Sequence, residues 1–189
     1  MTELWLVRHG QTDWNQENRL QGQQDIPLNE NGLKQAYRLA EQLAQIDFDV
    51  AYTSDLSRAR CTAEIVLKGR EIPLVVDERL RERNFGHWEG LPYEGVRVKF
   101  PEEHAARQAD PVGYCIPRGE SLNDVAVRLC HSAREIHHAY PTGKVLVVSH
   151  GHALSILKCL AQGDPLELFR IHRFENAEPV VTHWASPGC

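Results

Sequence analysis

The chain has 189 residues, of which 42% are hydrophobic and 25% are charged, and its formal net charge at pH 7 is −5. This length predicts one domain, residues 1–189, with a single core. An acidic chain is a poor ligand for phosphate backbones, so we expect no nucleic-acid partner. No run approaches the roughly 18 apolar residues that a membrane span needs, so we expect no membrane partner either.

The ends of the chain and its thiols indicate a cytoplasmic protein. The N-terminus lacks the basic segment and apolar run of a signal peptide. The five cysteines are far apart and form no C-x-x-C pair, which is more typical of reduced thiols than of a disulfide framework or a zinc site. Cys189 is the exception, because a terminal thiol is expected to be exposed.

Apolar patterning predicts strands that alternate with helices. We expect strands at residues 3–8, 49–53, 73–76, 144–149 and 179–184. We expect helices at residues 31–45, 55–68 (with Ser54 as N-cap), 120–138 and 151–161. This alternation predicts an α/β fold, a three-layer α/β/α sandwich with a mainly parallel central sheet.

The segment from 86 to 118 is predicted to be irregular and lid-like. It contains Pro92, Pro101, Pro111 and Pro117. Proline lacks a backbone N–H and interrupts helices and strands, so we expect no long element there.

Basic side chains follow two of the predicted strands. Arg8 and His9 come after the first strand, and His150 comes after the strand at 144–149. Arg58 lies about one turn into the helix that follows another strand. Ligands bind beyond the carboxyl ends of parallel strands, so we expect these four side chains to converge. A guanidinium group can donate two parallel hydrogen bonds to two oxygens of one phosphate, so the two arginines predict a phosphate site.

Seven sequence blocks, spread over most of the chain, resemble the histidine phosphatase superfamily, also called the phosphoglycerate mutase-like family. The blocks, in order, are RHGQTDWN at 8–15, NRLQG at 18–22, PLNENG at 27–32, SDLSRA at 54–59, LRERNFGHWEG at 80–90, PRGES at 117–121 and VSHG at 148–151. The resemblance implies a phosphoglycerate mutase-like fold.

The resemblance also implies catalytic roles. His9 would be the nucleophile that forms a phosphohistidine, and Arg8, Arg58 and His150 would bind the phosphoryl oxygens. Glu82 would protonate the leaving group and then accept a proton from water. An acid must hold its proton, so we expect the pKa of Glu82 to be raised near the incoming dianion.

Five further residues are expected to surround the phosphate. The resemblance implies that Asn15, Gln21 and Gly22 would donate hydrogen bonds to the phosphate or to the bridging oxygen. Gly10 and Gly151 follow the two histidines, where glycine lets the backbone turn tightly and approach a ligand.

Structural roles remain open for several of these residues. Arg8 could pair with Asp55, and Glu82 could be a solvated charge in a charged loop. Asn15 could cap a helix. We expect His152 either to begin a helix or to support the residues that contact the substrate.

His150-x-His152 has the spacing of a pair of metal ligands. No H-x-H-x-D or H-E-x-x-H pattern accompanies it. We therefore expect a metal-independent enzyme without a cofactor.

The resulting hypothesis is a phosphomonoesterase that hydrolyses a small phosphorylated metabolite with a neutral or partly apolar leaving group. Mutases of the family carry a longer, basic segment after the acid, whereas residues 86–118 are short and not basic. The block at 80–90 also resembles the alpha-ribazole and broad-specificity phosphatases. The alternatives are a cofactor-dependent phosphoglycerate mutase and a catalytically silent module that binds phosphorylated ligands. Whether the chain is a monomer or a homodimer stays open.

Overall fold

The computed structural model describes residues 1–185, and a five-stranded sheet forms their centre. The strands lie in the order β3-β2-β4-β1-β5. Their bounds are β1 (Thr2–Arg8), β2 (Val50–Thr53), β3 (Leu74–Val76), β4 (Lys144–Ser149) and β5 (Pro179–Trp184). The first four are parallel and β5 is antiparallel to β1, which confirms the mainly parallel sheet.

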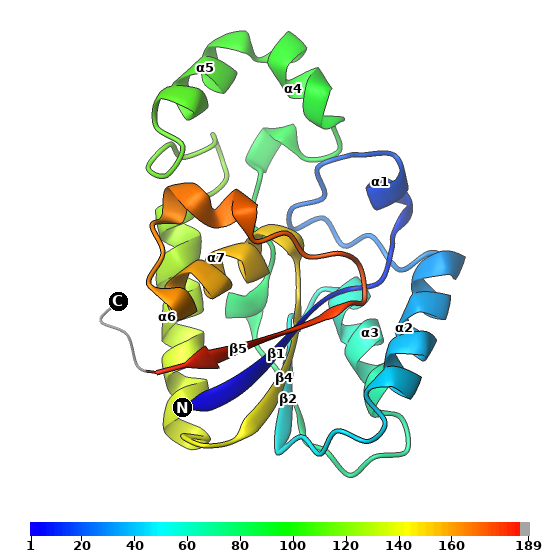
Figure 1. The fold of residues 1–189 in the computed structure, drawn as a ribbon. Helices are drawn as coiled ribbons and strands as arrows, with labels where there is room; N and C mark the ends of the chain where they lie inside the picture. Colours follow the sequence, from blue (N-terminus) through cyan, green and yellow to red (C-terminus); the bar gives the residue numbers. More distant parts are fainter. Residues whose placement is uncertain (186–189) are drawn as a thin grey trace.

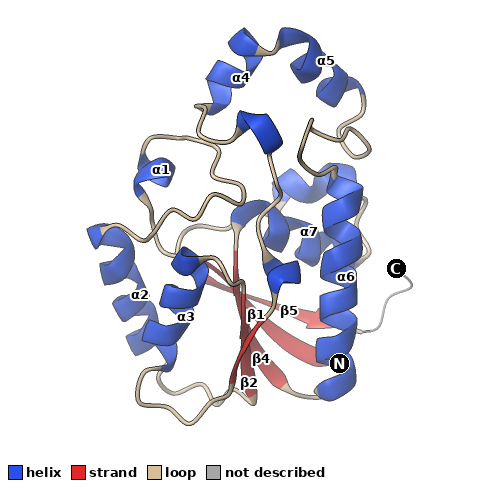
Figure 2. Ribbon diagram, turned by 180° about the vertical axis from the view of Figure 1, so that it is seen from behind, coloured by secondary structure: helices blue, strands red, loops and turns tan. Residues whose placement is uncertain are grey.

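Helices cover both faces of the sheet (Figures 1 and 2). One face carries α2 (Glu30–Gln42) and α3 (Ser57–Leu67), and the other carries α6 (Leu122–Ala139) and α7 (Gly151–Gln162). Successive residues of a strand face opposite sides. In β4, Val145 and Val147 therefore join the core under α6 and α7, whereas Leu146 and Val148 join the core under α2 and α3. The predicted three layers are confirmed.

The predicted elements are present with small changes at their ends. The helix expected from residue 55 begins at Ser57, and its N-cap is Leu56 rather than Ser54. The hydroxyl of Ser54 accepts a hydrogen bond from the Leu56 N–H (3.3 Å), so it stabilises the turn before the helix. Four short helices were not expected, because they are too short to show a period: α1 (Asp13–Gln16), η1 (Glu78–Leu80), η2 (Gly86–Trp88) and η3 (Leu166–Ile171).

The prediction of an irregular segment at 86–118 is wrong in part. It contains α4 (Tyr93–Lys99) and α5 (Pro101–Ala109), which lie together beyond the carboxyl ends of the strands (Figure 1). Pro92 is the N-cap of α4, and Pro101 is the first residue of α5. Proline fits a helix start because the first N–H groups have no partner within the helix. The prolines therefore begin helices here as well as interrupting them. We call residues 86–118 the cap.

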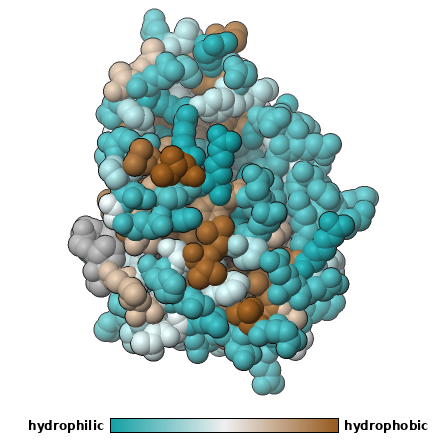
Figure 3. Space-filling model, in the orientation of Figure 1, coloured by the Kyte–Doolittle hydropathy of each residue, from teal (hydrophilic) through white to brown (hydrophobic). Residues whose placement is uncertain are grey.

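Cys61, Cys115 and Cys159 are free thiols. Cys189 lies outside the described residues. Within residues 1–185 no helix combines the length and apolar character that crossing a bilayer requires. The face in Figure 3 is largely hydrophilic, with hydrophobic atoms gathered over η3, where Leu168 and Ile171 are exposed.

Candidate active site

The polar ends of the parallel strands meet at one cavity of about 110 Å³, below the cap. Four of the predicted catalytic residues line this cavity, although they are far apart in the chain: Arg8, His9, Arg58 and Glu82. The lining residues are Arg8, His9, Asn15, Arg19, Leu20, Gln21, Gly22, Arg58, Glu82, Phe85 and His152. His150 adjoins it, with its ring centroid 5.1 Å from that of His9. The structure thus brings together the four basic side chains.

His9 follows β1 and is almost fully buried. Its Nδ1 lies 2.7 Å from the carbonyl oxygen of Gly10. A carbonyl can only accept, so Nδ1 carries the proton and Nε2 keeps its lone pair. Burial, followed by the charges of Arg58 and Arg8, holds the pKa of His9 well below 6.5. His9 is therefore a neutral imidazole with a free nucleophilic nitrogen.

His150 follows β4 and is the N-cap residue of α7. The Nε–H of Arg58 donates to its Nδ1 over 3.2 Å. Burial and the charge of Arg58 hold the pKa of His150 well below 6.5, so the ring is neutral and its proton sits on Nε2. That Nε2–H is buried and has no acceptor within residues 1–185. An unsatisfied buried donor is costly, and an oxyanion beside it would satisfy it.

Arg58, in the first turn of α3, is completely buried. Its two terminal nitrogens donate to the carbonyl oxygens of Gln24 and Gly22, each over 2.7 Å. Burial lowers the pKa of Arg58 to about 10, so the guanidinium stays charged at neutral pH. These bonds fix the position of the cation beside both histidines.

Arg8 donates from Nη1 to the carbonyl oxygen of Phe174 over 3.1 Å. Its buried Nε has no acceptor in the part of the chain that the structure describes. The alternative in which Arg8 pairs with Asp55 is wrong, because Arg81 forms that ion pair. Arg8 therefore adds a second donor that a phosphoryl oxygen could use.

Glu82 is buried, so it is not a solvated loop charge. Its carboxylate accepts from the backbone N–H groups of Arg83 (2.8 Å), His152 (3.1 Å) and Ala153 (3.1 Å), the last two in the first turn of α7. Burial opposes ionisation, but the hydrogen bond from the His152 side chain and that from the backbone N–H of Arg83 outweigh it. They hold the pKa of Glu82 well below its ordinary value. In the resting site the N–H groups at the start of α7 stabilise the carboxylate, and the rise of the pKa beside an incoming dianion stays a prediction.

Asn15 and Gln21 line the cavity and also have structural roles. Asn15 closes a capping box with Thr12 at the start of α1, as the alternative for this residue predicts. The hydroxyl of Thr12 donates to Oε1 of Gln21 over 2.8 Å. This bond leaves the amide N–H groups of Gln21 as its potential donors.

The three glycines differ in what surrounds them. Gly22 has φ +52° and its carbonyl oxygen accepts from Arg58. A Cβ at Gly151 would lie 3.6 Å from Nε of Arg8, so this glycine borders the site. A Cβ at Gly10 would lie 2.5 Å from the carbonyl oxygen of Gly32. Gly10 is therefore needed for close packing against the start of α2, not at the cavity wall.

His152 lies in the first turn of α7, as expected, and its ring packs against those of Phe85 and Phe169. Its Nδ1 is 3.8 Å from Oε2 of Glu82. His150 and His152 belong to no group of three or more potential metal ligands within residues 1–185.

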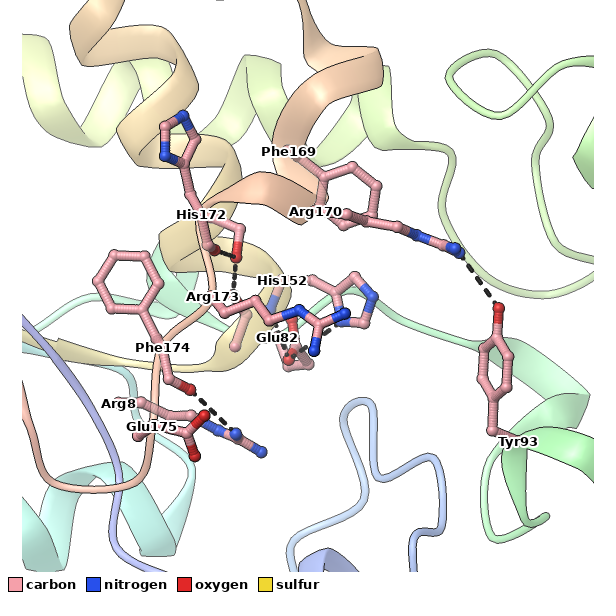
Figure 4. A pocket seen from close by; sticks show the side chains of 12 residues that line it. Arg8, Glu82, Tyr93, His152, Phe169, Arg170, His172, Arg173, Phe174 and Glu175 are labelled. Carbon is pink, nitrogen blue, oxygen red and sulfur yellow. Dashed lines mark hydrogen bonds and ion pairs between the residues drawn. The ribbon is translucent and has the colours of Figure 1, made fainter.

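A larger cavity of about 470 Å³ adjoins the first and shares Arg8, Glu82 and His152 with it. Tyr93, Phe169, Arg170 and residues 172–175 also line it (Figure 4). The sequence did not predict this part of the wall, because residues 169–175 lie at the end of a short 3-10 helix and directly after it and contain no motif or period.

Comparisons with known proteins identify the family of the chain. The family model of the histidine phosphatase superfamily (branch 1) matches residues 4–189. An uncharacterized phosphatase, PhoE, of Bacillus subtilis (strain 168) is 37% identical over 166 residues, which cover 87% of this chain and 80% of PhoE. "Probable phosphoglycerate mutase GpmB" of Yersinia pestis (strain Pestoides F) is 37% identical over 180 residues, covering 93% of this chain and 82% of GpmB.

Solved structures give the same result. The alpha-ribazole phosphatase from Shigella flexneri superposes with a TM-score of 0.87 at 28% identity, covering 95% of this chain and 89% of that chain. With a family match over nearly the whole sequence and a phosphoglycerate mutase-like fold, the chain belongs to the histidine phosphatase superfamily.

Proposed function

We propose that this chain is a phosphomonoesterase that hydrolyses a small phosphorylated metabolite through a phosphohistidine on His9. One observation carries the proposal. The free lone pair of His9 lies beside two buried donors without acceptors in residues 1–185, the Nε2–H of His150 and the Nε–H of Arg8. Positioning and charge stabilisation dominate the catalysis of phosphoryl transfer. A nucleophile beside one cationic and one neutral hydrogen-bond donor, both without an acceptor, suits this reaction.

In the first step, Nε2 of His9 forms a bond to phosphorus while the bond from phosphorus to the ester oxygen breaks. Arg8, Arg58 and His150 stabilise the charge on the phosphoryl oxygens. Asn15, Gln21 and Gly22 border the same cavity and help to hold the group. The leaving oxygen takes a proton through Glu82. Because Glu82 is ionised in the resting site, we propose that this proton arrives with the monoanion of the ester.

In the second step, a water molecule attacks the phosphohistidine. Glu82 accepts a proton from this water as the new bond to phosphorus forms. The bond between phosphorus and Nε2 breaks, and its electron pair returns to His9 as the lone pair. The Nδ1–H bond to the carbonyl oxygen of Gly10 persists through both steps, so the ring leaves as the same neutral tautomer.

A phosphoglycerate mutase is the second candidate, because one relative carries that name. A mutase returns the phosphoryl group to a phosphoglycerate, whereas a phosphatase gives it to water. Incubation with 3-phosphoglycerate and a trace of 2,3-bisphosphoglycerate separates the two. Release of phosphate supports the phosphatase, and fast isomerisation without release supports the mutase. Lack of both reactions, together with tight binding of phosphate esters, would support a silent binding module.

The direct test is phosphate release from p-nitrophenyl phosphate by the wild type and by His9→Ala. We expect turnover in the wild type, unchanged by EDTA, and none in His9→Ala. His138→Ala is the matched control, because His138 is an exposed histidine on α6. Turnover in His9→Ala at the wild-type rate would contradict the proposal, and so would loss of the wild-type activity on adding EDTA.

A further inference from the structure

The larger cavity is placed to receive the leaving group. It shares Arg8 and Glu82 with the reaction cavity, so a group bonded to the ester oxygen extends into it. Its inner wall carries the rings of His152, Phe169 and Phe174. These apolar faces suit the body of a leaving group such as a ring or a short carbon chain.

Two guanidinium groups converge on one oxygen at the outer end of this cavity. The phenol oxygen of Tyr93, on α4, accepts from Nη1 of Arg107 and from Nη2 of Arg170, each over 3.2 Å. Arg107 comes from α5 and Arg170 from η3, so the cap and the C-terminal segment meet at this point. Figure 4 shows Arg170 reaching across to Tyr93, with Arg173 extending over the same cavity.

These cations lack a counter-ion. Arg107, Arg170 and Arg173 form no ion pair within residues 1–185, although Arg107 is only 8% exposed. The guanidinium of Arg107 packs over the rings of Trp88 and Tyr93, with its carbon 5.9 and 5.7 Å from their centroids. Burying an arginine without a carboxylate is costly, and an anionic ligand would offset that cost.

Three carboxylates also line these cavities. The backbone N–H groups of Arg83, His152 and Ala153 hold Glu82. Glu175 interacts with Arg8 at the reaction end. Glu167 lines a neighbouring cavity of about 250 Å³, to which Tyr93, Arg107 and Arg170 also contribute. Arg170 and Arg173 line the larger cavity itself, and none of the three carboxylates forms an ion pair with these arginines within residues 1–185.

We propose that Arg170 and Arg107, joined through Tyr93, form with Arg173 on the wall of the same cavity an anion subsite that selects phosphomonoesters with a second anionic group on the leaving group. The inference rests on the proposed function and names its substrate class. An anionic oxygen in place of the phenol would make shorter, charge-assisted bonds to both guanidinium groups. Carboxylate and phosphate share this chemistry. The expected leaving group therefore changes from a neutral to an anionic one. The earlier expectation was based on residues 86–118, whereas η3 and the residues after it supply further basic side chains.

The test compares esters that differ only in the charge at the far end. One probe is the phosphate ester of a phenol with a para-propanoate chain, and the second carries the corresponding amide. Their leaving oxygens have closely similar pKa values, so a difference in kcat/KM reports the remote charge. A third ester, whose chain ends in a phosphonate, distinguishes a carboxylate site from a phosphate site. Turnover of p-nitrophenyl phosphate tests the proposed function separately.

We expect the wild type to prefer the propanoate over the amide by at least about tenfold in kcat/KM, the factor that one such interaction contributes. Arg170→Gln should reduce this preference to about threefold or less, and Arg170→Lys should restore part of it. Arg97→Gln is the matched control, because Arg97 is an exposed arginine of the same cap that lines none of these cavities. It should leave the preference unchanged.

Binding supplies a readout that does not depend on turnover. In the His9→Ala background, calorimetry should give tighter binding of the propanoate ester than of the amide, and Arg170→Gln should remove the difference. Equal kcat/KM and equal binding for the two esters, in a protein that hydrolyses p-nitrophenyl phosphate, would overturn the anion subsite and leave the proposed function standing. A preference that survives in Arg170→Gln and Arg173→Gln would also overturn it.

Discussion

Arg58 fixes the tautomer of His150. The Nε–H of Arg58 donates to Nδ1 of the imidazole over 3.2 Å, so the proton of the neutral ring sits on Nε2. The two residues are 92 positions apart, one in α3 and one at the end of β4. A buried cation thus both supplies charge and aims a neutral donor at the phosphoryl site.

Replacing Arg58 with lysine should therefore damage more than the local charge. The planar guanidinium of Arg58 donates to the carbonyl oxygens of Gly22 and Gln24 and to Nδ1 of His150. A lysine ammonium is not planar and cannot make these three bonds in the same geometry. We expect kcat for p-nitrophenyl phosphate to fall by about 10²–10³-fold, the usual effect of losing a donor to the transition-state oxyanion. Arg60→Lys, at an exposed position of the same helix, is the control. Equal kcat values for the two variants would show that the fork has no role.

Glu82→Gln should separate substrates by their leaving groups. Nitrophenol leaves without help, whereas an alkoxide needs a proton. We expect the variant to slow an alkyl phosphate such as glycerol 3-phosphate by about 10²–10⁴-fold, and p-nitrophenyl phosphate much less. Glu78→Gln provides the control, since Glu78 is an exposed acid of the same stretch. Equal losses on both esters would remove Glu82 from the acid role.

The rate should not follow an ordinary imidazole titration. Nucleophilic attack needs neutral His9, and burial with the charges of Arg58 and Arg8 lowers its pKa well below 6.5. The neutral form therefore persists as the pH falls through about 6.5, and is lost only at clearly lower pH. The fraction of the ester that is present as its monoanion meanwhile increases as the pH falls towards the second phosphate pKa of about 6. We expect kcat/KM to rise between about pH 8 and pH 6. A decline that begins near pH 6.5, in protein shown to be folded by circular dichroism, would contradict this.

Gly10→Ala should disturb the site through the fold. The new Cβ would lie 2.5 Å from the carbonyl oxygen of Gly32, which belongs to the backbone and cannot rotate away, so the chain beside His9 must shift. We expect a loss of about 1–3 kcal/mol in the free energy of unfolding, measured with urea, together with lower kcat. Gly95→Ala in α4 meets only ordinary contacts, the nearest at 3.4 Å. It should be neutral or slightly stabilising.

The fold and part of the site could be predicted from the sequence where a local pattern and a topological rule act together. Apolar runs predicted the strands, and the parallel-sheet rule then placed Arg8, His9 and His150 at one edge. The short helices of the cap were missed because Pro92 and Pro101 were read as interruptions, although proline also favours a helix start.

Contacts between distant segments could not be read from the sequence. Arg83 belongs to a charged run that resembles a solvated loop, yet it is completely buried and donates to the carbonyl oxygens of Glu120 and Tyr114. The pKa of Glu82 depends on N–H groups about 70 residues away in α7. The contact between Tyr93 and Arg170 depends on how the cap sits over η3. Only the folded chain brings these groups together.

The most direct test of the account is to trap the phosphoryl enzyme. Wild-type protein would be mixed with p-nitrophenyl phosphate, quenched in alkali within one turnover and digested for mass spectrometry, with His9→Ala treated in parallel. The account predicts an acid-labile, alkali-stable phosphoryl group on Nε2 of His9 in the wild type and none in the variant. Rapid turnover without phosphorylation of His9, or phosphorylation of another residue at a competent rate, would contradict it.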